Sequence, residues 1–285
     1  MRSDRPTSDL SSADSGSGDL SSDDLSSRDL DFDDLLRLVD ERSAAFRAAV
    51  EAAPDLGAQV PTCPEWTLLD LAHHIGTGRR AWAATVAAGP AATGKAAPAD
   101  PTLPPDDRGT LVEWLVESTR LLLDALAEAG PDRVCWTWWG DSQSPSTCAA
   151  VARHQLQEVA VHTYDAELTV HGTASLPTEV ALDGVEEFLA TCNATTSPWP
   201  HDPATLDYVV TEGRAWRLHL SGDGARAERL AAPAGQGGPQ QPADVSAQAC
   251  ASDVVLFMYG RRSVDEMPID GNAEVFDQLI AWVPE

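Results

Sequence analysis

The sequence predicts an α+β protein, with a four-helix bundle first and a small α+β domain with an antiparallel sheet after it. Between residues 31 and 172, apolar residues recur every three or four positions in four segments, which is typical of amphipathic helices packed as an antiparallel bundle. After about residue 175, short segments alternate apolar and polar residues, which is the period of a β-strand. The predicted parts are an acidic tail at 1–29, the bundle at 30–173 and the α+β domain at 174–285.

The first two helices have clear limits in the sequence. The first is expected at residues 31–53, and Pro54 ends it. The second is expected to begin after Thr67, because Thr67 suits the N-cap and Asp70, three residues on, completes a capping box. It should continue to about Ala88.

The third helix follows a long loop rich in Pro and Gly at residues 89–109. Thr110 and Glu113 have the spacing of a second capping box, so the helix is expected to begin at Thr110. Gly130 and Pro131 are typical of the end of a helix.

The fourth helix is expected after an aromatic segment that contains Trp136, Trp138 and Trp139. We predict that these rings pack in the core or between the domains, with the lining of a pocket as the alternative. Ser144 can serve as the N-cap with Pro145 at the first helical position. Gly172 should end this helix.

The α+β domain is expected to begin with a helix at residues 178–192 and to end with two more helices. Between them lie four segments with the composition of strands. The strand segments are residues 206–212, 214–221, 227–232 and 245–251, and the closing helices are residues 253–262 and 274–283.

Charge and composition limit the partners of the chain. Its 45 acidic and 19 basic residues give a formal net charge of −26, which opposes binding to nucleic acid or to an anionic membrane surface. The tail at 1–29 consists mainly of Ser, Asp and Gly without apolar periodicity, so we predict that it is disordered and dispensable.

Location and redox state follow from similar observations. No run approaches 18 apolar residues, and the N-terminus has no hydrophobic segment of the kind found in secretory signals. The five cysteines include no C-x-x-C pair, which argues against a disulfide framework and a thiolate zinc ribbon. We therefore expect a cytoplasmic protein, with Cys63 buried as a small apolar residue.

Two helices carry residues that could bind a metal ion. His74 lies on the predicted core face of the second helix. Glu158 and His162 lie four residues apart on the fourth helix, with Asp165 one turn further on the same side. Imidazole nitrogens and a carboxylate oxygen are normal zinc ligands, and three protein ligands leave a position open for a thiol or water. The same pattern also fits a plain pair on a helix face and a core histidine with a hydrogen-bond partner.

Two segments resemble the mycothiol-dependent maleylpyruvate isomerase family, which belongs to the DinB-like metal-binding helix bundles. Residues 60–76, V-P-T-C-P-E-W-T-L-L-D-L-A-H-H-I-G, are similar to the family segment V-P-x-C-P-x-W-T-x-x-D-L-x-x-H-L-G. Residues 153–167, R-H-Q-L-Q-E-V-A-V-H-T-Y-D-A-E, are similar to R-R-x-x-x-E-x-x-x-H-x-x-D-A-E. The segment 253–262, D-V-V-L-F-M-Y-G-R-R, matches the family's L-x-L-W-L-x-G-R near the C-terminus.

This resemblance implies a site and a chemistry. His74, Glu158 and His162 would hold a divalent metal, zinc as the first choice, and mycothiol would be the thiol cofactor bound there. The thiolate adds to a conjugated cis double bond, rotation follows, and the thiol leaves to give the trans isomer. Arg261 matches the arginine of the C-terminal domain that contributes to activity, and it would suit a small acidic substrate. The C-terminal domain would be of the sterol-carrier type.

The sequence departs from the family pattern at places that concern the substrate. His154 stands where the family has the second Arg of its R-R pair, and Thr163 and Tyr164 replace the common Arg-Trp. A mycothiol S-transferase of detoxification or specialised metabolism is therefore an alternative function. A non-catalytic metal-binding module, whose second domain holds a ligand, is another.

Overall fold

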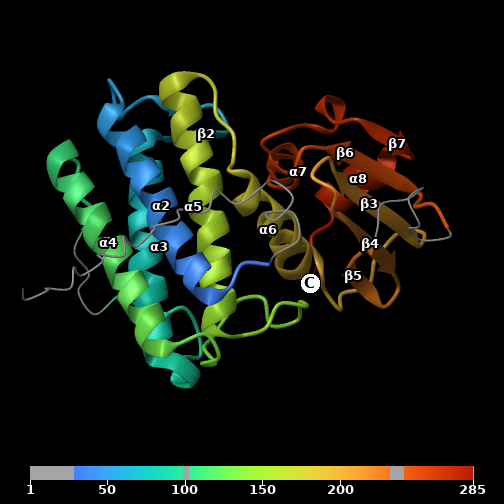
Figure 1. The fold of residues 1–285 in the computed structure, drawn as a ribbon, viewed down its shortest axis with the longest axis horizontal. Helices are drawn as coiled ribbons and strands as arrows, with labels where there is room; N and C mark the ends of the chain where they lie inside the picture. Colours follow the sequence, from blue (N-terminus) through green and yellow to red (C-terminus); the bar gives the residue numbers. More distant parts are fainter. Residues whose placement is uncertain (1–28, 99–102, 232–240, 285) are drawn as a thin grey trace, which may run out of the picture.

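The computed structural model of the protein describes residues 29–98, 103–231 and 241–284. Figure 1 shows two parts beside one another, a bundle of long helices and a smaller part built around a sheet. The α+β class is confirmed. The bundle helices are α2 (Phe32–Ala52), α3 (Leu68–Ala88), α4 (Arg108–Ala129) and α5 (Cys148–His171).

The predicted limits of α2 and α3 are confirmed. Asp31 caps α2, and its side chain accepts a hydrogen bond from the Asp34 backbone. At the start of α3, Thr67 and Asp70 form the predicted capping box. The helix continues to Ala88, as its sequence predicts.

The predicted starts of α4 and α5 are wrong by a few residues. Asp107 caps α4, because its carboxylate reaches the Thr110 backbone N–H and so places Thr110 inside the helix. Thr147 caps α5. Thr147 also pairs with Val134 in an isolated antiparallel bridge, which holds Ser144 in the preceding loop.

A hairpin that the sequence analysis did not identify precedes α3. Its strands are β1 (Gln59–Val60) and β2 (Cys63–Thr67), paired antiparallel. The Gln59 side-chain amide donates hydrogen bonds to the backbone oxygens of Pro64, at 2.6 Å, and of Trp66, at 2.7 Å. These bonds fix the segment that enters α3, and with it the wall of the site described below.

The C-terminal part contains a five-stranded sheet in the order β5-β4-β3-β6-β7. The pairing of β3 with β6 is parallel, whereas the other pairs are antiparallel as predicted. Strand alternation in a sequence does not reveal strand direction, so the sheet is mixed where a purely antiparallel one was expected. The strands are β3 (Ala204–Val210), β4 (Ala215–Ser221), β5 (Gly224–Arg229), β6 (Val245–Ala249) and β7 (Ile269–Gly271), of which β7 was not predicted.

Three helices accompany this sheet, each where the sequence places one. A π-helical turn, Leu189–Asn193, extends the first of them, and a single-turn helix lies at Val264–Glu266. Another single-turn helix, Gly89–Ala91, follows α3 in the bundle. The helices are α6 (Thr178–Phe188), α7 (Ala251–Met258) and α8 (Glu274–Ala281).

One cluster of buried apolar side chains continues from the bundle into the C-terminal part. It includes Trp82 and Leu156 of the bundle, Val180 of α6 and Phe276 of α8. Because the two parts share this core, the division near residue 173 stays a prediction.

The aromatic segment before α5 contributes unequally to this core. Trp139 is buried and Trp136 is partly buried, as predicted, but Trp138 is half exposed. None of the helices in the described ranges is both long and apolar enough to cross a membrane.

The loop before α5 also covers the edge of the sheet. The Gln143 side-chain amide donates a 3.0 Å hydrogen bond to the Ala227 backbone oxygen and accepts one of 2.6 Å from the Ala227 N–H. Two residues along β5, Ala225 exchanges both of its backbone hydrogen bonds with Thr195. The outer edge of β5 is thus paired although no further strand of the described residues lies beside it.

The predicted tail lies almost entirely outside the described residues. Its last residue, Asp29, is described, and its carboxylate accepts a 2.7 Å hydrogen bond from Arg229 on β5.

Candidate functional site

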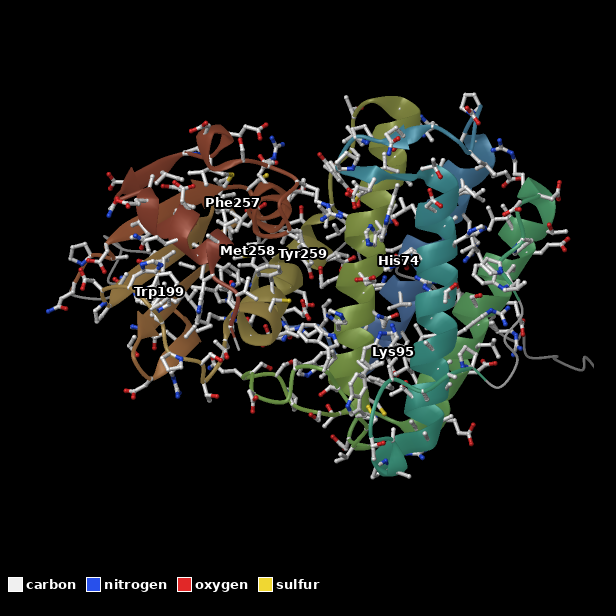
Figure 2. All side chains as sticks on the ribbon, turned by 180° about the vertical axis from the view of Figure 1, so that it is seen from behind. His74, Lys95, Trp199, Phe257, Met258 and Tyr259 are labelled. Atoms are coloured by element: carbon white, nitrogen blue, oxygen red, sulfur yellow. The ribbon has the colours of Figure 1, made fainter. Side chains whose placement is uncertain are left out.

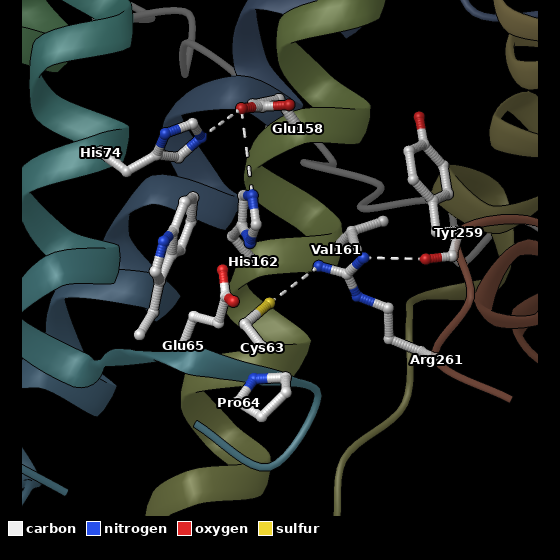
Figure 3. Close-up of a pocket in the computed structure, with 10 residues that line it drawn as sticks. Cys63, Pro64, Glu65, His74, Glu158, Val161, His162, Tyr259 and Arg261 are labelled. Carbon is white, nitrogen blue, oxygen red and sulfur yellow. Dashed lines mark hydrogen bonds and ion pairs between the residues drawn. The ribbon is translucent and has the colours of Figure 1, made fainter. Parts of the chain in front are cut away.

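The structure brings the three predicted metal ligands together between α3 and α5. His74 Nε2 lies 2.8 Å from Glu158 Oε1, and His162 Nε2 lies 3.9 Å from the same oxygen (Figure 3). The ligand atoms of the three residues all lie within 4.8 Å of one another. His73, the neighbour of His74, faces elsewhere, since its Nε2 contacts the Pro105 backbone oxygen.

The donor set fits a divalent ion such as zinc. Two imidazoles and one carboxylate are a ligand combination that zinc commonly takes in catalytic sites. Burial alone would raise the pKa of Glu158, but the hydrogen bond from His74 and the nearby imidazole of His162 outweigh it and lower the pKa to about 2. The carboxylate is therefore ionised at neutral pH, which is the form that binds a cation.

A second group of potential ligands consists of Cys63, His162 and Asp165. A cation already lies there, because Arg261 Nη2 contacts Asp165 Oδ2 at 2.7 Å and Cys63 Sγ at 3.4 Å. The guanidinium takes the place that a metal ion would need. We therefore assign the candidate metal position to the group formed by His74, Glu158 and His162.

Asp165 orients His162 from behind. Its carboxylate is fully buried and lies 2.8 Å from His162 Nδ1. The ionised carboxylate accepts, so Nδ1 carries the proton and Nε2 is left to face Glu158 and His74. A carboxylate behind a histidine is the usual arrangement around metal-ligating imidazoles.

Several donors keep Asp165 ionised. Thr62 Oγ1 donates to Oδ1 at 2.6 Å, and Arg261 donates through Nε at 3.2 Å and through Nη2. Burial would raise the pKa of Asp165, but the hydrogen bonds from His162 and Arg261 outweigh it and lower the pKa to about 2. The sequence analysis placed Asp165 on this face of the helix but gave it no role.

Arg261 reaches this site from the turn after α7. Gly260 has a φ of 73°, a left-handed conformation that favours glycine and turns the chain directly after the helix. Four of the five N–H groups of Arg261 are used: two on Asp165, one on Cys63 and one on the Tyr259 backbone oxygen. Arg261, which the family resemblance suggested for an acidic substrate, thus makes a two-pronged contact with Asp165.

These residues surround a cavity of about 640 Å³ at the boundary of the two parts. Trp66 forms one wall, with its ring centroid 4.7 Å from that of His74. In Figure 2 His74 lies among the bundle helices and Tyr259 lies where the C-terminal part faces them. The lining residues are Cys63, Pro64, Glu65, Trp66, His74, Glu158, Val161, His162, Tyr259 and Arg261.

Two lining residues correct or extend the sequence analysis. Cys63 is not a buried apolar residue: it is partly exposed and contacts both Asp165 and Arg261. Tyr259 was not identified as a site residue. Its position two residues before Arg261 is a signal that could have identified it.

The fold and the site together define a class: a helix bundle with two His and one Glu facing a cavity that an α+β part closes. The family comparison agrees with this class. The model of the Mycothiol maleylpyruvate isomerase N-terminal domain matches residues 36–167, and that of the MDMPI C-terminal domain matches residues 179–278. The chain belongs to the mycothiol-dependent maleylpyruvate isomerase family.

Solved structures share this fold. A crystal structure of the mycothiol-dependent maleylpyruvate isomerase has a TM-score of 0.51 and 15% sequence identity, over 85% of this chain and 93% of that chain. A His-to-Ala mutant of that isomerase has a TM-score of 0.51 and 14% identity, with the same coverage. No curated protein matches the chain.

Proposed function

We propose that this protein is a metal- and mycothiol-dependent enzyme of the maleylpyruvate isomerase type. The observation that carries the proposal is the convergence of His74, Glu158 and His162 in a cavity that Arg261 also lines. The family match and the shared fold support the same chemistry. The five cysteines are unpaired, which suits a reducing cytoplasm where a low-molecular-weight thiol serves as cofactor.

His74, Glu158 and His162 would hold the metal ion, for which zinc is the best candidate. When bound, the ion would lower the pKa of a coordinated thiol, so that the thiolate persists near neutral pH. Asp165 keeps His162 in the tautomer that presents Nε2 to the site. The Trp66 ring packs beside the His74 imidazole on this wall.

Arg261 would act on a small acidic substrate. One N–H group of its Nη1 is left after the four hydrogen bonds described above, and the side chain lines the cavity. A single charge-assisted hydrogen bond to a substrate oxygen contributes about 1.5–3 kcal/mol. The guanidinium can therefore hold the charge of the substrate while it also fixes Asp165.

Metal analysis tests the first half of the proposal. Purified wild-type protein should contain about one equivalent of zinc, and His162→Ala should contain almost none. His73→Ala is the matched control, because His73 faces Pro105 and not the site. Equal zinc content in wild type and His162→Ala would overturn the ligand assignment.

An activity screen tests the second half. Zinc-loaded protein is given mycothiol together with maleylpyruvate, or with an electrophile that an S-transferase would consume. Turnover of maleylpyruvate with recovery of free thiol supports the isomerase, whereas stoichiometric loss of thiol identifies an S-transferase. Zinc binding without either reaction would leave a non-catalytic metal-binding module.

A further inference from the structure

A second group of polar side chains meets the same cavity through Tyr259. Tyr259 lines the cavity, and its hydroxyl donates a 3.4 Å hydrogen bond to Glu187 Oε2. The other oxygen of Glu187 lies 3.0 Å from His154 Nδ1. The three residues come from α5, α6 and the turn after α7, so the group forms only when the two parts are assembled.

Glu187 is an unusual residue for this position. It is 1% exposed, and a buried carboxylate beside a cavity for acidic ligands would repel them. His154 opposes this effect: burial would lower its pKa, but the hydrogen bond to Glu187 and the nearby carboxylates outweigh burial and raise it. The rings of Trp138 and Trp139 surround His154, with centroids 5.6 Å and 5.1 Å from its own. The buried carboxylate of Glu187 thus has the His154 imidazole as its hydrogen-bond partner.

Tyr259 is suited to donate a hydrogen bond. Burial, together with the nearby Glu187, raises its pKa well above the usual value, so the phenol keeps its proton at neutral pH. Its hydrogen bond to Glu187 is long for an O–H donor, so a closer acceptor on a ligand can receive this hydrogen bond instead. Figure 3 shows the hydroxyl pointing away from Arg261, so that the two side chains offer donors at different ends of one wall.

We propose that Tyr259 is a specificity-determining residue that donates a hydrogen bond to a carboxylate or oxo oxygen of the ligand, with Glu187 and His154 as its positioning residues. The inference rests on the proposed function, in that the ligand of this cavity is taken to be acidic. It assigns the two ends of such a ligand to two side chains of this cavity, one end to Arg261 and the other to Tyr259. His154 replaces the second Arg of the family's R-R pair, and Tyr259 stands at a position that the family segment L-x-L-W-L-x-G-R leaves open.

Binding of maleate, a small dicarboxylate, tests this inference by titration calorimetry without thiol. Tyr259→Phe should weaken binding about tenfold or more, the loss expected for one hydrogen bond to a charged group. Tyr164→Phe is the matched control, because Tyr164 is buried on α5 outside the cavity lining, and it should bind as wild type does. His154→Gln keeps a donor for Glu187 but removes the imidazole that positions it, and it should weaken maleate binding severalfold.

A spectroscopic readout separates donation from a structural role. The chain has three tyrosines, so ring-labelled tyrosine gives three NMR signals, and Tyr259→Phe assigns one of them. Maleate should shift the Tyr259 signal and leave that of Tyr208, which is buried in the sheet, unchanged. An unshifted Tyr259 signal at saturation, wild-type affinity in Tyr259→Phe, or no maleate binding by wild type would each overturn the inference. A shifted signal in a protein that binds no zinc would support it while the proposed function fails.

Discussion

The bundle and the sheet bury charge in different ways. The described strands bury one ion pair, Asp207 with Arg217, in which both oxygens of the carboxylate meet the guanidinium at 2.6 and 2.8 Å. In the bundle, Asp165 and His162 are also buried, but they belong to a network that continues to an open cavity. The buried ion pair of the sheet stabilises the fold alone, whereas the network of the bundle includes side chains that line the cavity and can contact a ligand there. The comparison identifies the sheet as support and the helix faces as the working surface.

Removing Arg261 breaks the link between the two parts and should have the largest effect. Arg261→Ala leaves the fully buried Asp165 without its cation, which typically costs about 3–5 kcal/mol of unfolding free energy. Chemical denaturation should show this loss, together with lower activity.

Arg261→Lys separates the two effects. A lysine keeps a positive charge beside Asp165 but lacks the remaining Nη1 donor, so it should recover much of the stability and little of the turnover. Full recovery of turnover in this variant would show that Arg261 acts through Asp165 alone.

A substitution inside the bundle, Gly76→Ala, tests how closely the helices α3 and α4 are packed. At Gly76 of α3, a Cβ atom would lie 1.9 Å from the Trp114 ring of α4, so Gly76→Ala must push the two helices apart. Overpacking of this kind costs up to about 3 kcal/mol. Thermal unfolding should show the loss. Gly78→Ala is the control, because nothing lies near the added atom, and it should keep or slightly raise the wild-type melting temperature.

Acid should weaken the bundle network around Asp165. The pKa of Asp165 is lowered to about 2 in the folded protein from 3.8, so its contribution is complete above pH 4 and is lost as the pH falls toward 2. That contribution is about 2 kcal/mol. Unfolding free energies of metal-free protein between pH 5 and pH 2 should therefore fall less steeply in Asp165→Asn than in wild type. Parallel slopes would contradict the prediction.

The tail should have the smallest effect. Asp29 contacts Arg229 at the protein surface, and exposed ion pairs contribute less than about 1 kcal/mol. Protein that lacks residues 1–29 should therefore keep its melting temperature and zinc content. A drop of many degrees would show that the tail packs against the sheet or the bundle.

The sequence predicted the helices better than the connections. Periodicity and the Thr67–Asp70 capping box identified α3 because they depend on nearby residues alone. The β1–β2 hairpin is held by the Gln59 side chain, and the direction of β6 by pairing with β3, so neither leaves a local pattern.

The same distinction holds for the site. His74, Glu158 and His162 could be found from helix spacing and family resemblance, and the structure places them together. The contact of Arg261 with Asp165 and that of Tyr259 with Glu187 join residues 96 and 72 positions apart, so only the folded chain reveals them.

The amide of Gln143 has a consequence for how copies of this protein meet. An uncovered outer strand can accept a strand from another molecule, which is a common start of aggregation. Here the Gln143 side chain occupies the donor and acceptor of Ala227, and Thr195 occupies those of Ala225. Gln143, from the loop before α5, therefore blocks edge-to-edge pairing of β5 with a strand of another molecule at Ala227.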